Sequence, residues 1–168
     1  MNHSQQLSDD GYTVLENIFT KNEVSSIVQA IDQTNAAGQA FRKTKDLFAI
    51  RQFLKEVPAV QPLIFNEQLN GIISEFFGKD YFVVKSIYFD KPQESNWFVS
   101  YHQDLTIAVQ KKIEYDGFSQ WTVKYDQFSV QPPVDVLKNI FTIRIHLDDT
   151  DENNVALKVI PGSHLKGI

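Results

Sequence analysis

Apolar residues recur at helical spacing in two stretches of the first half of the chain. In the first stretch, Thr20 and Glu23 stand at the spacing of a capping box, which marks the start of a helix. The apolar positions that follow are Val24, Ile27, Val28 and Ile31. They share one face of a helix, and Gly38 offers a place for that helix to end. The pattern predicts an amphipathic helix that begins after Thr20.

The second stretch begins near Asn66 and ends at Gly78-Lys79-Asp80. Its apolar positions are Leu69, Ile72, Ile73, Phe76 and Phe77. Because Asn is favoured just before a helix and Gly just after one, this stretch predicts a second amphipathic helix. The segment from Phe48 to Leu54, which lies between the two, is also predicted to be helical.

From Tyr81 onward the chain is rich in β-branched and aromatic residues, which favour strands. The predicted strands are Tyr81 to Phe89, Phe98 to Val109, Trp121 to Val130, Asn139 to Leu147 and Val155 to Ile160. Helices followed by strands indicate an α+β domain with an antiparallel core. We therefore expect one domain over residues 1–168, in which residues 1–80 form a mainly helical flank.

The polar face of one predicted strand, a lysine and a tryptophan are candidates for a binding site. In the stretch 141–148 apolar residues alternate strictly with Thr142, Arg144, His146 and Asp148. That polar face is either solvated or, if the strand lines the mouth of a barrel, part of a site. Lys85 is either an interior cation awaiting an anion or a charge on an edge strand. Trp121 is either a wall of a substrate site or a packed aromatic side chain.

The composition limits the chemistry that the chain can carry. It has 168 residues, 42% of them hydrophobic, which suits a folded domain with a core of its own. The absence of cysteine excludes disulfides, iron–sulfur clusters and thiolate zinc sites. A metal ion would therefore be held by nitrogen and oxygen ligands.

Charge and hydropathy limit the partners. The net charge of −5 is spread along the chain, without a Lys/Arg cluster that would bind a nucleic acid backbone. The first residues lack the basic and apolar regions of a secretion signal, and no stretch reaches the roughly 18 apolar residues of a membrane span. We expect a soluble, cytoplasmic protein that binds a small molecule and neither nucleic acid nor membrane. The sequence does not indicate an oligomeric state.

His102 and Asp104 are the candidate metal ligands. In a strand, side chains two residues apart lie on the same face, so this imidazole and this carboxylate would converge while Gln103 points away. One imidazole and one carboxylate are two thirds of the facial triad that holds Fe(II) with positions open for a cosubstrate and oxygen. A His and an Asp at this spacing also arise by chance, so the neighbouring motifs decide.

Five ordered groups of residues resemble the phytanoyl-CoA dioxygenase family. They are Phe89-Asp90-Lys91-Pro92, Asn96-Trp97, Tyr101-His102-Gln103-Asp104-Leu105, Leu147-Asp148-Asp149 and Leu157-Lys158-Val159-Ile160-Pro161-Gly162-Ser163-His164. The segment from Asp10 to Leu15 and the helix after Thr20 also resemble the amino-terminal flank of that family. The resemblance thus covers nearly the whole chain.

The resemblance implies a double-stranded β-helix (jelly-roll) fold, of which residues 81–168 would be the first part, with a core that is incomplete at the carboxyl end. It implies a dioxygenase that uses Fe(II), O2 and 2-oxoglutarate to hydroxylate a small organic substrate. His102 and Asp104 then match the first two iron ligands. The far carboxylate of 2-oxoglutarate needs a cation, for which Arg144 and Lys85 are the candidates, although the principal arginine of the family is expected after residue 168.

The chain departs from the family in its third iron ligand. After Asp104 only His146 and His164 remain, and by resemblance neither is the distal histidine. His146 is either a residue lining the substrate pocket or a solvated one, and His164 belongs to the turn Pro161-Gly162-Ser163-His164. Three explanations stay open. The chain is part of a complete oxygenase; or it is a truncated, inactive jelly-roll protein with a binding or regulatory role; or His146 or His164 completes a shortened site. An acidic chain favours a small substrate without coenzyme A.

Overall fold

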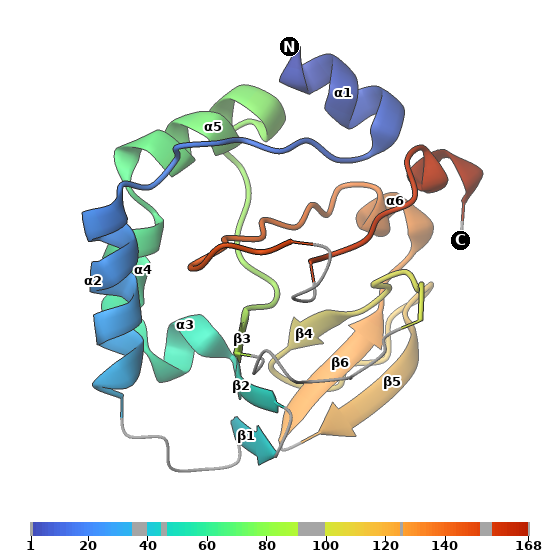
Figure 1. Ribbon diagram of the computed structural model, residues 1–168. Helices are drawn as coiled ribbons and strands as arrows, with labels where there is room; N and C mark the ends of the chain where they lie inside the picture. Colours follow the sequence, from blue (N-terminus) through green and yellow to red (C-terminus); the bar gives the residue numbers. More distant parts are fainter. Residues whose placement is uncertain are drawn as a thin grey trace. The chain divides into compact units, whose positions relative to one another are not determined.

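The computed structural model describes residues 2–34, 40–44, 47–90, 100–124, 126–151 and 156–167, and it contains both helices and antiparallel sheets (Figure 1). The backbone divides into two compact units. The helical unit comprises Met1–Thr34, Val57–Tyr81 and Leu147–Ile168, and the sheet unit comprises Asn35–Glu56 and Phe82–His146. The predicted α+β class with helices near the amino terminus is confirmed. A single domain over residues 1–168 stays a prediction.

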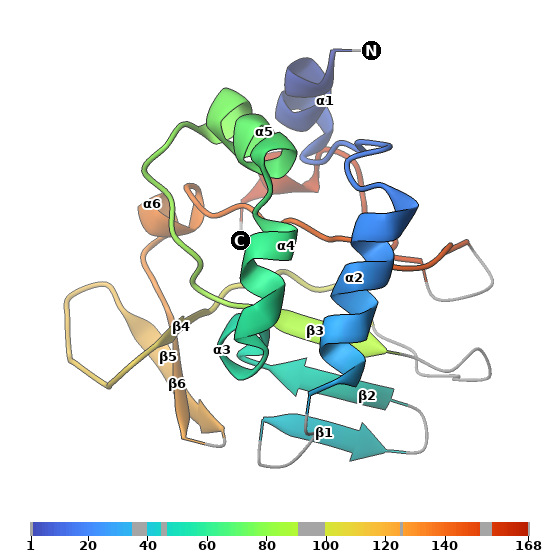
Figure 2. The same cartoon turned by 90° about the vertical axis from the view of Figure 1, so that its left-hand side faces the viewer.

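The helical unit is built from short helices around an aliphatic core. Its elements are α1 (His3–Asp10), α2 (Lys21–Asp32), the 3-10 helix η1 (Pro58–Val60), α4 (Gln61–Ile64), α5 (Glu67–Phe77) and the 3-10 helix η2 (Ser163–Lys166). Helices α2 and α4 run side by side (Figure 2). The buried side chains of this unit are Ile27, Ile31, Val57, Val60, Ile64 and Leu69. Val60, with 0% of its surface exposed, lies at the centre of this core.

Both amphipathic helices of the prediction are confirmed. The Thr20 hydroxyl accepts a hydrogen bond from the backbone N–H of Glu23, and the Glu23 carboxylate accepts one from the backbone N–H of Thr20, so the capping box is complete. Helix α2 ends at Asp32, before Gly38, which lies outside the described residues. Helix α5 has Asn66 as its N-cap and Gly78 as its C-cap, as the sequence predicts.

The Glu23 carboxylate also ties the two helix starts together. Its second oxygen accepts a hydrogen bond of 3.1 Å from the side-chain amide of Asn66. The Asn66 side-chain oxygen in turn accepts a hydrogen bond of 2.9 Å from the backbone N–H of Leu69, in the first turn of α5. Hydrogen bonds from the Thr20 backbone, the Thr20 hydroxyl and Asn66 hold the pKa of Glu23 below its ordinary value of 4.5, because they favour the ionised carboxylate.

The first sheet of the sheet unit has the order β1 (Phe41–Thr44), β2 (Leu47–Arg51), β3 (Ile87–Asp90), all antiparallel (Figure 2). A short helix, α3 (Phe53–Glu56), follows β2. The backbone N–H of Phe53 donates to the Ser86 carbonyl, and the Phe53 ring stacks on Tyr88 of β3 at 5.6 Å. Helix α3 is therefore fastened to the sheet by the residues next to and within β3.

The helix predicted from Phe48 to Leu54 is wrong over its first half, where β2 is the central strand of this sheet. Ala49 and Ile50 are adjacent in sequence and both buried, so β2 is covered on both faces. A short apolar run covered on both sides has no period that separates strand from helix. The helical part begins only at Phe53, after Gln52 takes a positive φ of 52°.

The second sheet has the order β4 (Ile107–Val109), β6 (Gln127–Gln131), β5 (Ser119–Lys124), with β6 in the middle (Figure 1). Val130 of the central strand is fully buried. The single strand predicted from Trp121 to Val130 is wrong, because β5 and β6 are the two arms of a hairpin. Asp126, with a φ of 60°, lies at the hairpin turn, and Asp tolerates this left-handed conformation better than most residues. A short helix, α6 (Val134–Leu137), follows β6.

The other predicted strands are shorter than expected or absent. Of the two strands predicted over 81–89 and 98–109, the structure forms only the short strands Ile87–Asp90 and Ile107–Val109 among the described residues. Positions 98, 99 and 155 lie outside the described residues. Residues 139–147 and 156–160 form no strand, so both predictions are wrong there. The alternation survives in part, since Arg144 and His146 are exposed while Phe141 and Ile145 are half-buried. Alternation determines which side faces solvent, but a strand also needs a hydrogen-bonded neighbour.

Replacing Thr20 by Ala should lower the free energy of unfolding by about 1 kcal/mol, because the side chain that caps α2 is lost. Ser25→Ala is the matched control, since the Ser25 hydroxyl donates to the Lys21 carbonyl inside the same helix and should cost less than about 0.5 kcal/mol. Urea denaturation of the three proteins measures both values. Equal losses in the two variants would contradict a specific cap at Thr20.

Replacing Glu23 by Gln should make stability less dependent on pH. The folded-state pKa of Glu23 lies below its unfolded value, so its ionised form stabilises the fold above the unfolded pKa, and this contribution is lost as the pH falls through the folded pKa. The stability gap between wild type and Glu23→Gln should therefore be widest above the unfolded pKa and should narrow as the pH falls through the lower folded pKa. Denaturant titrations from pH 3 to pH 7 test this. A gap that stays constant over that range would show that the charge of Glu23 does not contribute.

Candidate metal centre

His102 is held with one ring nitrogen available for a ligand. It lies in residues 101–106, which lead into β4 without regular secondary structure. Its Nδ1 is 2.8 Å from the carbonyl oxygen of Ser100. A carbonyl oxygen only accepts, so Nδ1 carries the proton and donates, which leaves the lone pair on Nε2. The side chain is exposed, so Nε2 is accessible. A backbone carbonyl often fixes a metal-binding histidine in this way.

Asp104 lies next to a cation of the same unit. Its Oδ1 is 3.7 Å from Nζ of Lys85, and the two side chains are 75% and 41% exposed. A backbone hydrogen bond of 3.2 Å from Ala108 to Val84 fastens the segment that carries Lys85 to the start of β4. At this exposure and distance the ion pair contributes well below about 1 kcal/mol. Lys85 therefore compensates the charge of Asp104 without closing off the carboxylate.

The sequence predicts that His102 and Asp104 share one face of a strand, but the structure forms no strand at these residues. Residues 100–106 have no strand, because the ladder with β6 begins only at Ile107. The convergence of the two side chains therefore stays a prediction. Asn96 and Trp97, which belong to the motif before them, lie outside the described residues.

The described residues do not group a third ligand with this pair. Within them, no three His, Cys, Asp or Glu side chains gather closely enough to hold a metal ion. His146 and Arg144 lie exposed in the irregular segment 141–146 of the same unit. Of the residues predicted for iron and cosubstrate, Asp104 and Lys85 lie together as an ion pair.

His164 has a structural role in the helical unit. Its Nε2 is 3.0 Å from the Ser8 carbonyl and donates to it, since the carbonyl can only accept. Its ring covers Gly11, the C-cap of α1 with a φ of 80°, so closely that a Cβ there would lie 2.8 Å from Cγ of His164. The backbone N–H of Gly162 donates to the Asp10 carbonyl at 2.9 Å. The turn that carries His164 is thereby fastened to the end of α1.

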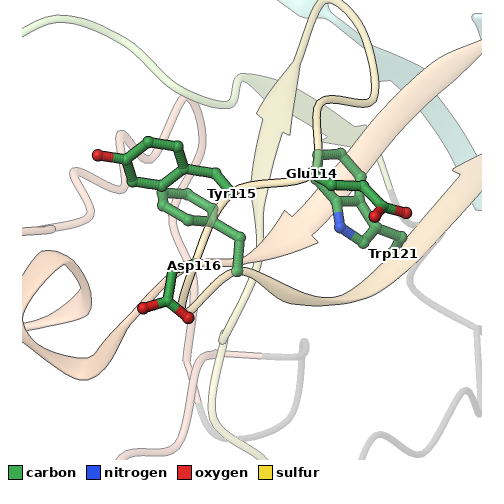
Figure 3. A pocket seen from close by; sticks show the side chains of 5 residues that line it. Glu114, Tyr115, Asp116 and Trp121 are labelled. Atoms are coloured by element: carbon green, nitrogen blue, oxygen red, sulfur yellow. The ribbon is translucent and has the colours of Figure 1, made fainter.

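Trp121 lines a hollow of 430 Å³ in the sheet unit (Figure 3). The other lining residues are Glu114, Tyr115, Asp116 and Phe118. Of these residues, only Trp121 is a candidate from the sequence. The signal for the other four is the succession of acidic and aromatic residues from Glu114 to Phe118 around a glycine. The partners of His102 and His164, which are the Ser100 and Ser8 carbonyls, carry no sequence signal because they are backbone groups.

Comparison with known proteins identifies the family. The family model described as phytanoyl-CoA dioxygenase (PhyH) matches residues 7–168, which is nearly the whole chain. No curated protein and no solved structure matches the chain significantly. In the part of the chain that the structure describes, none of the helices has the length and apolarity that crossing a membrane requires.

Replacing Gly11 by Ala should destabilise the protein by about 1–3 kcal/mol, because Ala is strained at a positive φ and its Cβ would collide with the His164 ring. Gly71→Ala is the matched control, since nothing lies within 4 Å of a Cβ in the middle of α5 and the change should stabilise by about 0.5–1 kcal/mol.

A double-mutant cycle of Gly11→Ala with His164→Ala separates the collision from the backbone strain, and thermal unfolding of the four proteins measures it. In the His164→Ala background, Gly11→Ala should cost clearly less than it does alone. Strict additivity of the two changes would contradict the contact between His164 and Gly11.

Proposed function

The chain belongs to the phytanoyl-CoA dioxygenase family, and from this membership we propose that it is a dioxygenase that depends on Fe(II) and 2-oxoglutarate and hydroxylates a small organic substrate. The match over residues 7–168 is the observation that carries the proposal. With it we propose the double-stranded β-helix as the complete fold, built from antiparallel sheets such as the two that the chain forms. The members of this fold place their ligands inside a barrel of such strands.

We assign two residues to the metal. His102 supports this assignment because its hydrogen bond to Ser100 leaves Nε2 free of a proton and accessible. Asp104 supports it because its carboxylate is largely exposed. Imidazole and carboxylate are the ligands that Fe(II) takes in oxygenases of this kind. When bound, the iron would supply the oxidising chemistry by activating O2 with 2-oxoglutarate.

Lys85 has two roles in this proposal. In the structure it compensates Asp104, and a divalent ion that binds the Asp104 carboxylate would take over that task. The ammonium group is then available for the far carboxylate of 2-oxoglutarate. Arg144, which is exposed in the same unit, is the second candidate for that anion. The net charge of −5 supports a substrate without the phosphates of coenzyme A.

A second function has an observation in its favour. Because the described residues group no third ligand with His102 and Asp104, a non-catalytic protein that keeps the fold as a binding or regulatory module is the alternative. The two functions differ in one property, which is whether this chain binds Fe(II) and 2-oxoglutarate together.

An anaerobic titration of the chain with Fe(II) and 2-oxoglutarate should produce the visible charge-transfer band of the iron chelate, and His102→Ala should abolish it. His146→Ala is the matched variant, because it removes an exposed histidine of the same unit, and it should keep the band. Circular dichroism confirms that each variant is folded.

Two outcomes would contradict parts of this account. A folded wild-type chain that gives no band would contradict an oxygenase formed by this chain alone, and it would fit both the non-catalytic module and a chain that is part of a complete oxygenase. A band that His146→Ala also abolishes would mean that His146 completes the metal site.

A further inference from the structure

The hollow beside Trp121 combines aromatic rings with carboxylates. Its volume is 430 Å³, and every lining residue comes from the short stretch between Glu114 and Trp121. The lining consists of three aromatic side chains and two acidic ones (Figure 3). Figure 3 shows the labelled residues as two groups, with Glu114 near Trp121 on one side and Tyr115 near Asp116 on the other. Each group therefore offers one carboxylate and at least one ring.

The loop that forms one side of the hollow has a defined shape. Gly117 has a φ of 78°, and a Cβ at this position would lie 2.9 Å from the ring of Pro133, so the loop packs closely on the segment after β6. The backbone N–H of Phe118 donates to the Tyr115 carbonyl at 3.1 Å. The Tyr115 and Phe118 rings meet edge to face at 5.7 Å. These contacts arrange the two rings before any ligand is present.

An irregularity in β5 places the third ring. Ser119 pairs with Gln131 and Thr122 with Ser129, so β5 has one more residue than β6 between these pairs, which is a β-bulge. Gln120, inside the bulge, has a φ of 53°. Trp121 is the half-buried residue of a strand whose other side chains are exposed. Bulges change the direction of a side chain, and this one turns the indole toward the hollow.

The ammonium group of Lys112 lies at this hollow. Nζ of Lys112 lies 6.0 Å from the centroid of the Trp121 ring and 3.8 Å from the Glu114 carboxylate. One ring and one carboxylate therefore attract a cation in the structure as it stands. The second group, Tyr115 with Asp116, also combines an aromatic ring with a carboxylate. Together, Glu114, Asp116 and Lys112 carry a net charge of −1.

We propose that this hollow binds the alkylated ammonium group of a small organic cation. Aromatic faces attract such groups, which carry a diffuse charge and shed water easily, and the carboxylates supply the opposite charge. An anion would meet Glu114 and Asp116, and a bare metal ion prefers oxygen ligands to rings. The ligand competes with Lys112 for Glu114 and Trp121. None of the lining residues is a predicted ligand of iron or 2-oxoglutarate, so this proposal does not rest on the metal assignment, although Trp121 is also the candidate wall of the substrate site.

Choline and its uncharged isostere 3,3-dimethylbutan-1-ol are the probes for this site. A titration of the full chain, followed by the NMR signal of the Trp121 indole N–H, should give a saturable shift with choline. The isostere should bind about tenfold more weakly, since it has the same shape without the charge. Equal binding of both molecules, or no shift of the Trp121 signal with choline, would overturn the proposal.

Three variants test which side chains carry the binding. Glu114→Gln should weaken choline about fivefold or more, while Asp135→Asn, which removes an exposed carboxylate of the same unit outside the hollow, should change it less than twofold. Lys112→Met keeps the alkyl chain and removes the competing ammonium, so it should tighten choline binding severalfold. Glu114→Gln without effect, or Lys112→Met that weakens binding, would contradict the proposal.

Discussion

The carboxylate of Asp104 lies beside the ammonium group of Lys85, and the candidate metal centre is built on this weak, exposed ion pair. Lys85 supplies the cation because a backbone hydrogen bond from Ala108 to Val84 fastens its segment to the start of β4. The two side chains are exposed and lie 3.7 Å apart, so the ion pair is weak and easily broken. In our proposal a divalent ion, which interacts with a carboxylate more strongly than an ammonium group does, replaces Lys85.

Two other carboxylates of the chain also have partners beside them. Glu23 is satisfied by hydrogen bonds from Thr20 and Asn66 and so joins the starts of two helices. Glu114 is paired with Lys112, next to the ring of Trp121. Glu23 is a structural group because its hydrogen bonds complete the cap of α2 and join it to the start of α5. Asp104 and Glu114 keep exposed partners that a ligand can displace, and for this reason we place the two binding proposals there.

The sequence predicts the helices α2 and α5 well and the strands poorly, for a physical reason. The signals at Thr20, Asn66 and Gly78 act on hydrogen-bonding groups a few residues away, so they can be recognised without knowing the rest of the fold. A strand depends on a partner that is distant in sequence. Residues 139–147 alternate as a strand would but are not a strand in the structure, whereas Leu47–Arg51 is the central strand of its sheet without a readable pattern.

The sequence predicts which residue types form the candidate metal centre, but it does not predict how their side chains are oriented. The types and spacing of His102 and Asp104 indicate an iron ligand pair, but the Ser100 carbonyl that orients His102 depends on a backbone conformation that no motif reveals. His164 looks from sequence like a third ligand or a polar turn residue. The structure uses it to cover Gly11, a contact between residues that are far apart in the chain.

Above all, we propose that His102 and Asp104 bind one divalent ion. The most direct test is to add Mn(II) to the isotope-labelled chain and follow the paramagnetic broadening of its NMR signals. We expect the signals of His102, Asp104 and Lys85 to broaden first, at substoichiometric metal, and to recover when EDTA is added. Broadening that is centred on other residues, or that leaves His102 and Asp104 sharp, would contradict the claim.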